Sequence, residues 1–224
     1  MQLCCTVSNV TPDLATPDRH RALRLENNRA IKLAALALAE ERGIGRFTVE
    51  ELALRADVSR RTFFNHFGSI HDATRAGLRD LLLDASEDIM TVLTGKTATN
   101  STETIGQLFD LCSAAIIEVD FTPTIKRMCR VLGVHHREDP ANSLWFAEVF
   151  ISIIADFKEL LESRAPHIPA ITRNLMIEVL LKGVEVSAEQ WLLTSLDLPH
   201  EQGLANWRAL HSKTVEQLRS GFGS

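Results

Sequence analysis

The chain has 224 residues, of which 45% are hydrophobic and 24% are charged, and its formal net charge is −5. These proportions are typical of a globular protein and exclude a disordered or fibrous chain. No run of about 18 uncharged apolar residues is present, so we expect no membrane-spanning helix. Residues 1–18 lack the basic start of a signal peptide, and we therefore expect a cytoplasmic protein.

Charge is distributed unevenly along the chain. Residues 19–80 contain twelve basic and eight acidic residues, a net charge of +4, whereas residues 81–224 carry a net charge of −7. A basic head on an acidic body is expected when one end of a protein meets a polyanion. The same excess also occurs on ordinary solvated surfaces, so the charge has to be judged together with the motifs.

The cysteines and histidines form no pattern that indicates a metal or a catalytic site. Cys4 and Cys5 are adjacent, Cys112 and Cys129 stand apart, and none has CxxC spacing. The pair at 135–136 lies in a polar segment, where solvated histidines are the simpler interpretation. The sequence contains no GxSxG, P-loop, GxGxxG or HExxH motif. We therefore expect no enzyme, no cofactor and no metal.

Apolar residues recur at intervals of three and four, and no segment alternates with period two, so the sequence predicts an all-α fold. The first helix is expected from Arg21 to Arg42, with Gly43 after its end. Two short helices follow at about 48–55 and 59–67, and then a long helix from Ser69. Proline and capping residues predict further helices at about 103–119 and from 122, 140, 169 and 199. This makes about nine helices, with a three-helix head and a larger bundle.

The two short helices have the arrangement of a helix-turn-helix, because only residues 56–59 join them and a longer helix precedes them. In the second, Phe63 and Phe67 share one face, which is expected to pack inward. The other face carries arginine, phenylalanine and asparagine at positions 60, 61, 64 and 65. Arginine can donate two hydrogen bonds to guanine, asparagine can pair with adenine, and phenylalanine can contact a thymine methyl group. The alternative is that these arginines only decorate a solvated surface.

Residues 29–73 resemble the DNA-binding head of the TetR family of bacterial regulators. The resemblance rests on the alanine pair of the first helix and the glycine that follows this helix, on TVEELA at 48–53 and on ADVSRRTFFNHF at 56–67. It implies a homodimer that binds palindromic double-stranded DNA, a small-molecule pocket in the C-terminal bundle, and repression relieved by the ligand. The residues expected at DNA are Thr48, Ser59, Arg60, Arg61, Thr62, Phe64, Asn65 and His66.

Three positions depart from the commonest family pattern. Asp57 stands where the turn usually has glycine, and aspartate is one of the few residues that tolerate a positive φ. His66 replaces a tyrosine near a phosphate, and Ile70 replaces a lysine that commonly binds phosphate. The loss of that lysine is expected to weaken backbone contacts. Arg19, Arg21 and Arg24 either compensate as an N-terminal arm or are plain solvated charges.

The bundle is expected to hold both the ligand and the dimer interface. Large soft side chains and one carboxylate are the ligand-binding candidates: Phe109, Cys112, Met128, Cys129, Trp145, Phe146, Glu148, Phe150 and Met176. Arg130 and Asp156 are further polar candidates. A seam of residues spaced by three and four, together with residues of the last helix, is the predicted dimer interface: Ile177, Leu181, Val184, Ala188, Trp191, Leu204 and Trp207. Each of these residues could equally belong to an intramolecular core.

The sequence thus predicts three segments: a disordered arm at 1–18, a helix-turn-helix DNA-binding domain at 19–68, and a ligand-binding and dimerisation domain at 69–224. The predicted function is a homodimeric repressor that a small apolar or amphipathic ligand releases from a palindromic operator. Two alternatives stay open at this point. One is an activator, and the other is a ligand-binding or interaction protein of the same fold that has lost DNA binding.

Overall fold

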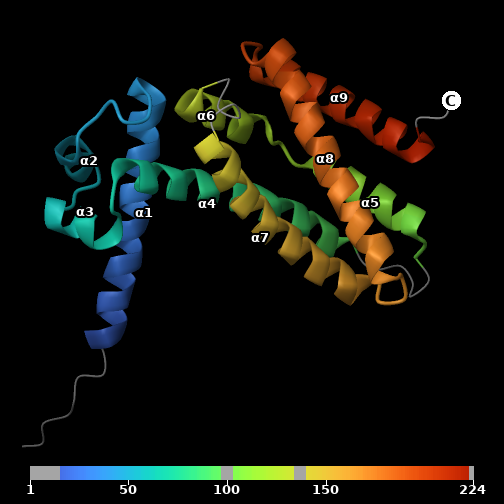
Figure 1. Cartoon of the computed structure of the whole chain (residues 1–224), viewed down its shortest axis with the longest axis horizontal. Coiled ribbons are helices and arrows are strands. Elements are labelled where there is room, and N and C mark those ends of the chain that lie inside the picture. The colour runs from blue at the N-terminus through green and yellow to red at the C-terminus, as the bar shows by residue number, and fades with distance from the viewer. Residues whose placement is uncertain (1–15, 97–102, 134–139, 222–224) are drawn as a thin grey trace, which may run out of the picture.

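The computed structural model of the chain describes residues 16–96, 103–133 and 140–221, and this part contains nine helices and no strand (Figure 1). The helices, in chain order, are α1 (Thr16–Arg42), α2 (Val49–Arg55), α3 (Arg60–His66), α4 (Ile70–Gly95), α5 (Ile105–Glu118), α6 (Thr122–Leu132), α7 (Pro140–Arg164), α8 (Ala170–Ser195) and α9 (His200–Ser220). None of these helices is long and apolar enough to cross a membrane. The prediction of an all-helical protein with a small head and a larger body is confirmed.

The head consists of α1, α2 and α3, which lie together at one end of the molecule (Figure 1). One face of α1 supplies Ile31, Ala35 and Leu38, and these pack with Leu52 of α2 and Phe63 of α3. All five side chains are buried. Burial of each of the four larger side chains stabilises the head by roughly 1.5–3 kcal/mol.

Helix α4 joins the head to the body (Figure 1). Its first half places Ala73 and Leu78 in the core of the head, and its second half places Ile89 and Leu93 in the core of the body. Gly77 lets α4 approach α1 closely, since a Cβ atom there would lie 2.8 Å from Leu36 Cγ. A movement of α4 therefore has to displace packed side chains at both ends.

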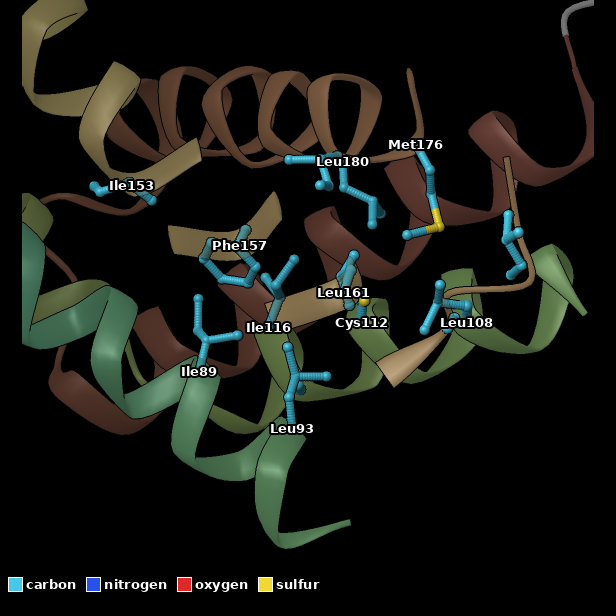
Figure 2. Close-up of a cluster of buried hydrophobic side chains, with 14 of the residues drawn as sticks. Ile89, Leu93, Leu108, Cys112, Ile116, Ile153, Phe157, Leu161, Met176 and Leu180 are labelled. Carbon is cyan, nitrogen blue, oxygen red and sulfur yellow. The ribbon is translucent and has the colours of Figure 1, made fainter. Parts of the chain in front are cut away.

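The body is built from α5 to α9 around the second half of α4. Figure 2 shows side chains from α4, α5, α7 and α8 meeting in one apolar cluster. The labelled members are Ile89, Leu93, Leu108, Cys112, Ile116, Ile153, Phe157, Leu161, Met176 and Leu180. Helices α8 and α9 form the most extensive helix pair of the described chain.

Most of the predicted helix ends agree with the structure, and two differ. Gly43 follows α1 with a φ of +91°, as expected for a residue that ends a helix. The first helix begins at Thr16 rather than Arg21, so residues 16–18 of the predicted disordered arm are helical. The rest of that arm, residues 1–15, lies outside the described residues. Helix α6 includes Thr122 as its first residue, because Asp120 Oδ1 accepts hydrogen bonds from the backbone N and the hydroxyl of Thr122.

Candidate functional site

The turn between α2 and α3 has the geometry that the sequence predicted. Thr48 caps α2 in a capping box with Glu51, and Ser59 caps α3 by accepting a hydrogen bond from the backbone N of Thr62. Asp57 has a φ of +53° and is the one non-glycine residue with positive φ among the described residues. The backbone N of Val58 donates to the carbonyl of Ala53 at 2.9 Å and closes the turn. Aspartate thus takes the left-handed conformation that glycine supplies more easily.

Helix α3 has one buried face and one open face. Phe63 is fully buried, and its ring lies 6.3 Å from that of Phe67, so this face anchors the helix to the head. Arg61 and Asn65 are exposed on the other side, and Phe64 keeps 51% of its surface exposed. An exposed phenylalanine beside an arginine and an asparagine is unusual for a purely solvated surface, since apolar rings are normally buried.

The two arginines of α3 differ in their surroundings. Arg60 Nη1 lies 2.6 Å from Glu50 Oε1 on α2, so a carboxylate holds this guanidinium. Arg61 makes no ion pair with any described residue, and its donors face solvent. The hydroxyls of Ser59 and Thr62 are 2.8 Å apart and belong to the cap of the helix. Arg61 is therefore the cation of α3 that is available to a ligand without breaking a pair.

The first turns of α1 carry further basic residues. Arg19, Arg21 and Arg24 are exposed and helical, and none forms an ion pair with another described residue. The sequence predicted these residues as part of an arm or as solvated charges. The structure places them on a helix that extends past α3 (Figure 1).

The body contains an apolar cavity of about 160 Å³ between α4, α5, α6, α7, α8 and α9. Five of the nine predicted ligand residues line it: Cys112, Met128, Cys129, Phe146 and Phe150. The other four, Phe109, Trp145, Glu148 and Met176, do not. Their positions have a simple physical reason, because Glu148 is exposed and the three large apolar residues pack into the body core away from the cavity. Arg130 and Asp156 are exposed and also do not line it.

Both cysteines of the cavity wall are free thiols in an apolar environment. Burial raises the pKa of Cys112 to about 12 and the pKa of Cys129 to about 11. Both thiols therefore stay protonated at neutral pH and are poor nucleophiles. No group of three His, Cys, Asp or Glu side chains in the described ranges could hold a metal ion, and the pair at 135–136 lies outside those ranges.

Much of the cavity wall was missed or assigned otherwise from the sequence. Helix α4 contributes Leu82, Ser86 and Ile89. The apolar periodicity of this helix predicts a packed face that includes Leu82 and Ile89, and it does not predict Ser86. Five residues predicted at the dimer interface line the cavity instead: Ile177, Leu181, Val184, Ala188 and Trp207. Periodicity shows which face of a helix is apolar, and it does not show whether a neighbouring helix, a cavity or a second chain covers that face.

Comparison with known proteins identifies the head. The family model for bacterial regulatory proteins of the tetR family matches residues 31–72. This segment contains most of α1, all of α2 and α3, and the start of α4. The head belongs to the TetR family. No curated protein matches the chain.

Solved structures share the fold of the TetR-family head and of the body. The fatty acid degradation regulator FadR from Bacillus halodurans superposes with a TM-score of 0.57 at 14% identity, covering 88% of this chain and 96% of that one. A protein from Mesorhizobium loti assigned to TetR-family transcriptional regulators gives 0.56 at 15% identity, covering 86% and 96%. FadR from Bacillus subtilis, solved in complex with stearoyl-CoA, gives 0.52 at 14% identity, covering 87% and 98%. At these identities the likeness concerns the fold.

Three of the seven predicted dimer residues are buried inside the body. Trp191 and Trp207 are fully buried and Ile177 is nearly so, so these three side chains are not accessible to a second copy. Trp191 Nε1 donates to the carbonyl of Gly203 at 2.7 Å, which holds α8 against α9. The prediction for these three residues is therefore corrected, because they pack within the body.

Helix α8 does present a different apolar row to solvent. Ile171, Leu175, Val186 and Leu193 are 47–79% exposed and fall on one side of the helix at intervals that fit the helical repeat. Exposed apolar residues that form one row indicate an interaction surface, whereas single scattered ones are normal on a protein surface. The same sequence periodicity also fits this second row. The sequence prediction favoured the row from Ile177 to Trp191, which has larger side chains.

Proposed function

We propose that this protein is a sequence-specific DNA-binding transcriptional regulator that acts as a homodimer and is released from a palindromic operator by a small apolar or amphipathic ligand. The observation that carries the proposal is the open face of α3 on a firmly packed head. This face offers a guanidinium at Arg61 that forms no ion pair with a described residue, a half-exposed ring at Phe64 and an amide at Asn65. Side chains of these three types distinguish base edges in the major groove of DNA.

The proposed DNA contacts are of two kinds: contacts to base edges, which select the sequence, and contacts to phosphates, which position the protein. Arg61, Phe64 and Asn65 would meet base edges, whereas Thr48, Ser59, Thr62 and His66 lie near helix ends where phosphates are accommodated. Arg60 would also contact bases, but the carboxylate of Glu50 beside it partly cancels its positive charge and weakens its attraction to DNA. The exposed arginines at the start of α1 add positive charge for the backbone and offset the absence of a basic side chain at Ile70.

The short length of α3 supports a homodimer. Helix α3 has seven residues and reads only a few base pairs, so two copies are needed to recognise a site that is rare in a genome. The exposed row of Ile171, Leu175, Val186 and Leu193 on α8 is the best candidate for the contact between copies. An interface built on a two-fold axis uses the same patch on both chains, and a single self-complementary helix face satisfies this requirement.

The cavity is the proposed ligand site, and α4 and α6 are the proposed links to the head. Met128 and Cys129 line the cavity from α6, while Val131 of the same helix packs in the core of the head. Helix α4 likewise touches the cavity at Ser86 and the head at Leu78. A ligand that prefers one arrangement of these helices changes the spacing of the two α3 helices and lowers DNA affinity. The stearoyl-CoA bound by Bacillus subtilis FadR supports an amphipathic ligand for this fold.

Selection from a randomised duplex library tests the proposal. The full-length protein should enrich sequences with two inverted half-sites at a fixed spacing, and its mass in solution should be that of a dimer. Enrichment of single half-sites would contradict the homodimer, and the absence of any enrichment would contradict sequence-specific binding. That last result would favour a ligand-binding protein without DNA affinity, a second candidate that rests on the substitution of Ile70 for a phosphate-binding lysine.

A further inference from the structure

The cavity in the body is small for a ligand site. Its volume is about 160 Å³, whereas sites for drug-sized ligands have volumes of about 300–1,000 Å³. An engineered apolar cavity of about 150 Å³ in another protein binds benzene. The space between the helices of the body therefore suits a ligand with a single ring and at most a short alkyl chain.

The wall of this cavity favours an aromatic ligand. Its aromatic rings belong to Phe121, Phe146, Phe150, Phe157 and Trp207. The rings of Phe121 and Trp207 are 6.0 Å apart, and those of Phe146 and Phe150 are 6.5 Å apart. Aromatic rings stabilise one another beyond the effect of their apolar area. Sulfur atoms also contact aromatic rings favourably, and the wall includes three sulfur-bearing residues: Cys112, Met128 and Cys129.

The polar groups of the wall offer little to a polar ligand. The hydroxyl of Ser86 donates to the carbonyl of Leu83 at 2.8 Å, within its own helix. The Nε1 atom of Trp207 is fully buried, so this indole meets the cavity with its ring carbons. Glu189 is exposed at the rim and has an interaction partner of its own. Thr124 supplies the other hydroxyl among the described residues that line the cavity.

A surface groove between α7 and α8 adjoins the cavity and differs from it in chemistry. The groove shares four wall residues with the cavity: Phe146, Phe150, Leu181 and Glu185. Its other residues include Glu178 and Lys182, and the ammonium nitrogen of Lys182 lies 2.9 Å from Glu185 Oε1. A hydrocarbon chain gains less beside such charged groups than inside an apolar wall. The groove is therefore a poor extension of the cavity for an alkyl chain.

We propose that the effector is a compact, uncharged aromatic hydrocarbon of about six to ten carbon atoms, which the cavity recognises by apolar contacts. A long acyl chain exceeds the volume of the cavity, and a polar head group gains no specific contact in it. This inference rests on the proposed function for the identity of the cavity as the ligand site. It goes further by assigning the size and the polarity of the ligand.

A series of alkylbenzenes measures the capacity of the cavity. Full-length protein is equilibrated with benzene, ethylbenzene, butylbenzene or hexylbenzene, and the free ligand is determined in the vapour above the solution. Each buried methylene should raise the affinity about fourfold. We expect this rise as far as butylbenzene and no further gain for hexylbenzene, because the cavity is then full. A rise that continues at the same rate to hexylbenzene would overturn the inference.

Two substitutions of alanine by phenylalanine separate the cavity from the groove. Ala188 lines only the cavity, and Ala147 lines only the groove. Ala188→Phe should weaken butylbenzene binding at least tenfold, because the added ring occupies the cavity. Ala147→Phe is the matched control and should leave this affinity unchanged. The reverse result would place the ligand in the groove and overturn the inference.

A cavity-enlarging variant keeps the test decisive if Ala188→Phe does not fold. Ile89 is buried in the cavity wall, so Ile89→Ala adds space there. This variant should bind hexylbenzene more tightly than butylbenzene, unlike the parent. An unchanged order of affinities would show that the volume of the cavity does not limit the ligand, and the inference would fall.

The alcohol 3-phenylpropan-1-ol tests the polarity of the ligand, because it is butylbenzene with a hydroxyl in place of the terminal methyl group. It should bind at least tenfold more weakly than butylbenzene, since its hydroxyl loses water and gains no specific partner. Thr124→Val should change neither affinity by more than about twofold, because the ligand is held by apolar contacts. An alcohol that binds as tightly as butylbenzene would overturn the inference.

Release of DNA by butylbenzene distinguishes a failure of this inference from a failure of the proposed function. If butylbenzene bound as expected and no DNA sequence did, the assignment of the cavity would stand and the regulator would fall. If the protein bound its operator and butylbenzene failed to release it, the regulator would stand and this inference would fall.

Discussion

Arg127 on α6 donates to Glu40 on α1, with Nε and Oε1 2.5 Å apart and both side chains partly buried. This pair connects the body to the head, 87 residues apart along the chain. The helix that carries Arg127 also presents Met128 and Cys129 to the cavity. A single helix therefore touches both the proposed ligand site and the head that would bind DNA.

Arg127→Ala should uncouple the ligand from DNA release. The cavity wall and the open face of α3 remain intact, so the affinity for ligand and for operator should each change little. The concentration of ligand needed to dissociate DNA should rise several-fold, because part of the contact between body and head is lost. Fluorescence anisotropy of labelled operator, titrated with ligand, measures this shift.

Arg219→Ala is the matched control for Arg127→Ala, since Arg219 pairs with Asp110 at 2.7 Å within the body. This substitution should leave the release concentration unchanged. Equal release curves for the parent and Arg127→Ala would show that α6 does not transmit the signal through this pair.

Arg61→Ala should weaken operator binding by about 1–3 kcal/mol and relax the choice of base at one position of each half-site. The reason is that Arg61, unlike Arg60, forms no ion pair within the described part of the chain, so its guanidinium can make two hydrogen bonds to one guanine. Binding to a set of operators with single-base changes measures both effects. An equal loss on every sequence would identify Arg61 as a phosphate contact instead.

Gly77→Ala should destabilise the protein by about 1–3 kcal/mol, since the added methyl group would overlap Leu36 where α4 meets α1. Gly95→Ala is the matched control near the end of the same helix, where a Cβ atom would have no neighbour within 4 Å. It should be neutral or slightly stabilising, because alanine favours helix more than glycine does. Urea denaturation of both variants checks the difference, and a Gly77→Ala variant as stable as Gly95→Ala would refute the close packing of α1 and α4.

The free energy of unfolding should decrease as the pH is lowered, because His211 is fully buried against Trp207 and Ser187. Burial lowers the pKa of His211 from 6.5 to about 4. The unfolded chain therefore binds a proton between these two values while the folded chain does not, and stability is lost as the pH decreases from about 6.5 toward 4. The loss reaches up to about 3 kcal/mol.

Urea denaturation of the parent and of His211→Gln at several pH values isolates this contribution. The variant should lose the part of the pH dependence between about 4 and 6.5 that His211 causes. Identical slopes for the two proteins would contradict the assigned burial effect.

The helices of this fold were predictable because their signals are local. Thr48 and Glu51 predict the start of α2, Ser59 predicts the start of α3, and Gly43 predicts the end of α1. The left-handed conformation of Asp57 was also expected, because the turn requires a positive φ at this position.

The cavity was only partly predictable because its wall depends on packing between helices far apart in the chain. Cys112 and Phe150 were identified by their size and softness, but Leu82 and Ser86 gave no signal that separates a cavity wall from a core. Trp207 was assigned to a dimer interface and lies inside one chain. An apolar face shows that something covers it, and only the tertiary structure shows what that is.

Sequence-selective DNA binding is the central claim, and anisotropy of two labelled duplexes at two salt concentrations tests it most directly. One duplex comes from upstream of the gene for this protein and the other is unrelated. We expect the full-length protein to bind the upstream duplex more tightly, and we expect this binding to weaken as salt increases because basic side chains displace counterions from DNA. Absence of binding to both duplexes even at low salt would contradict the account.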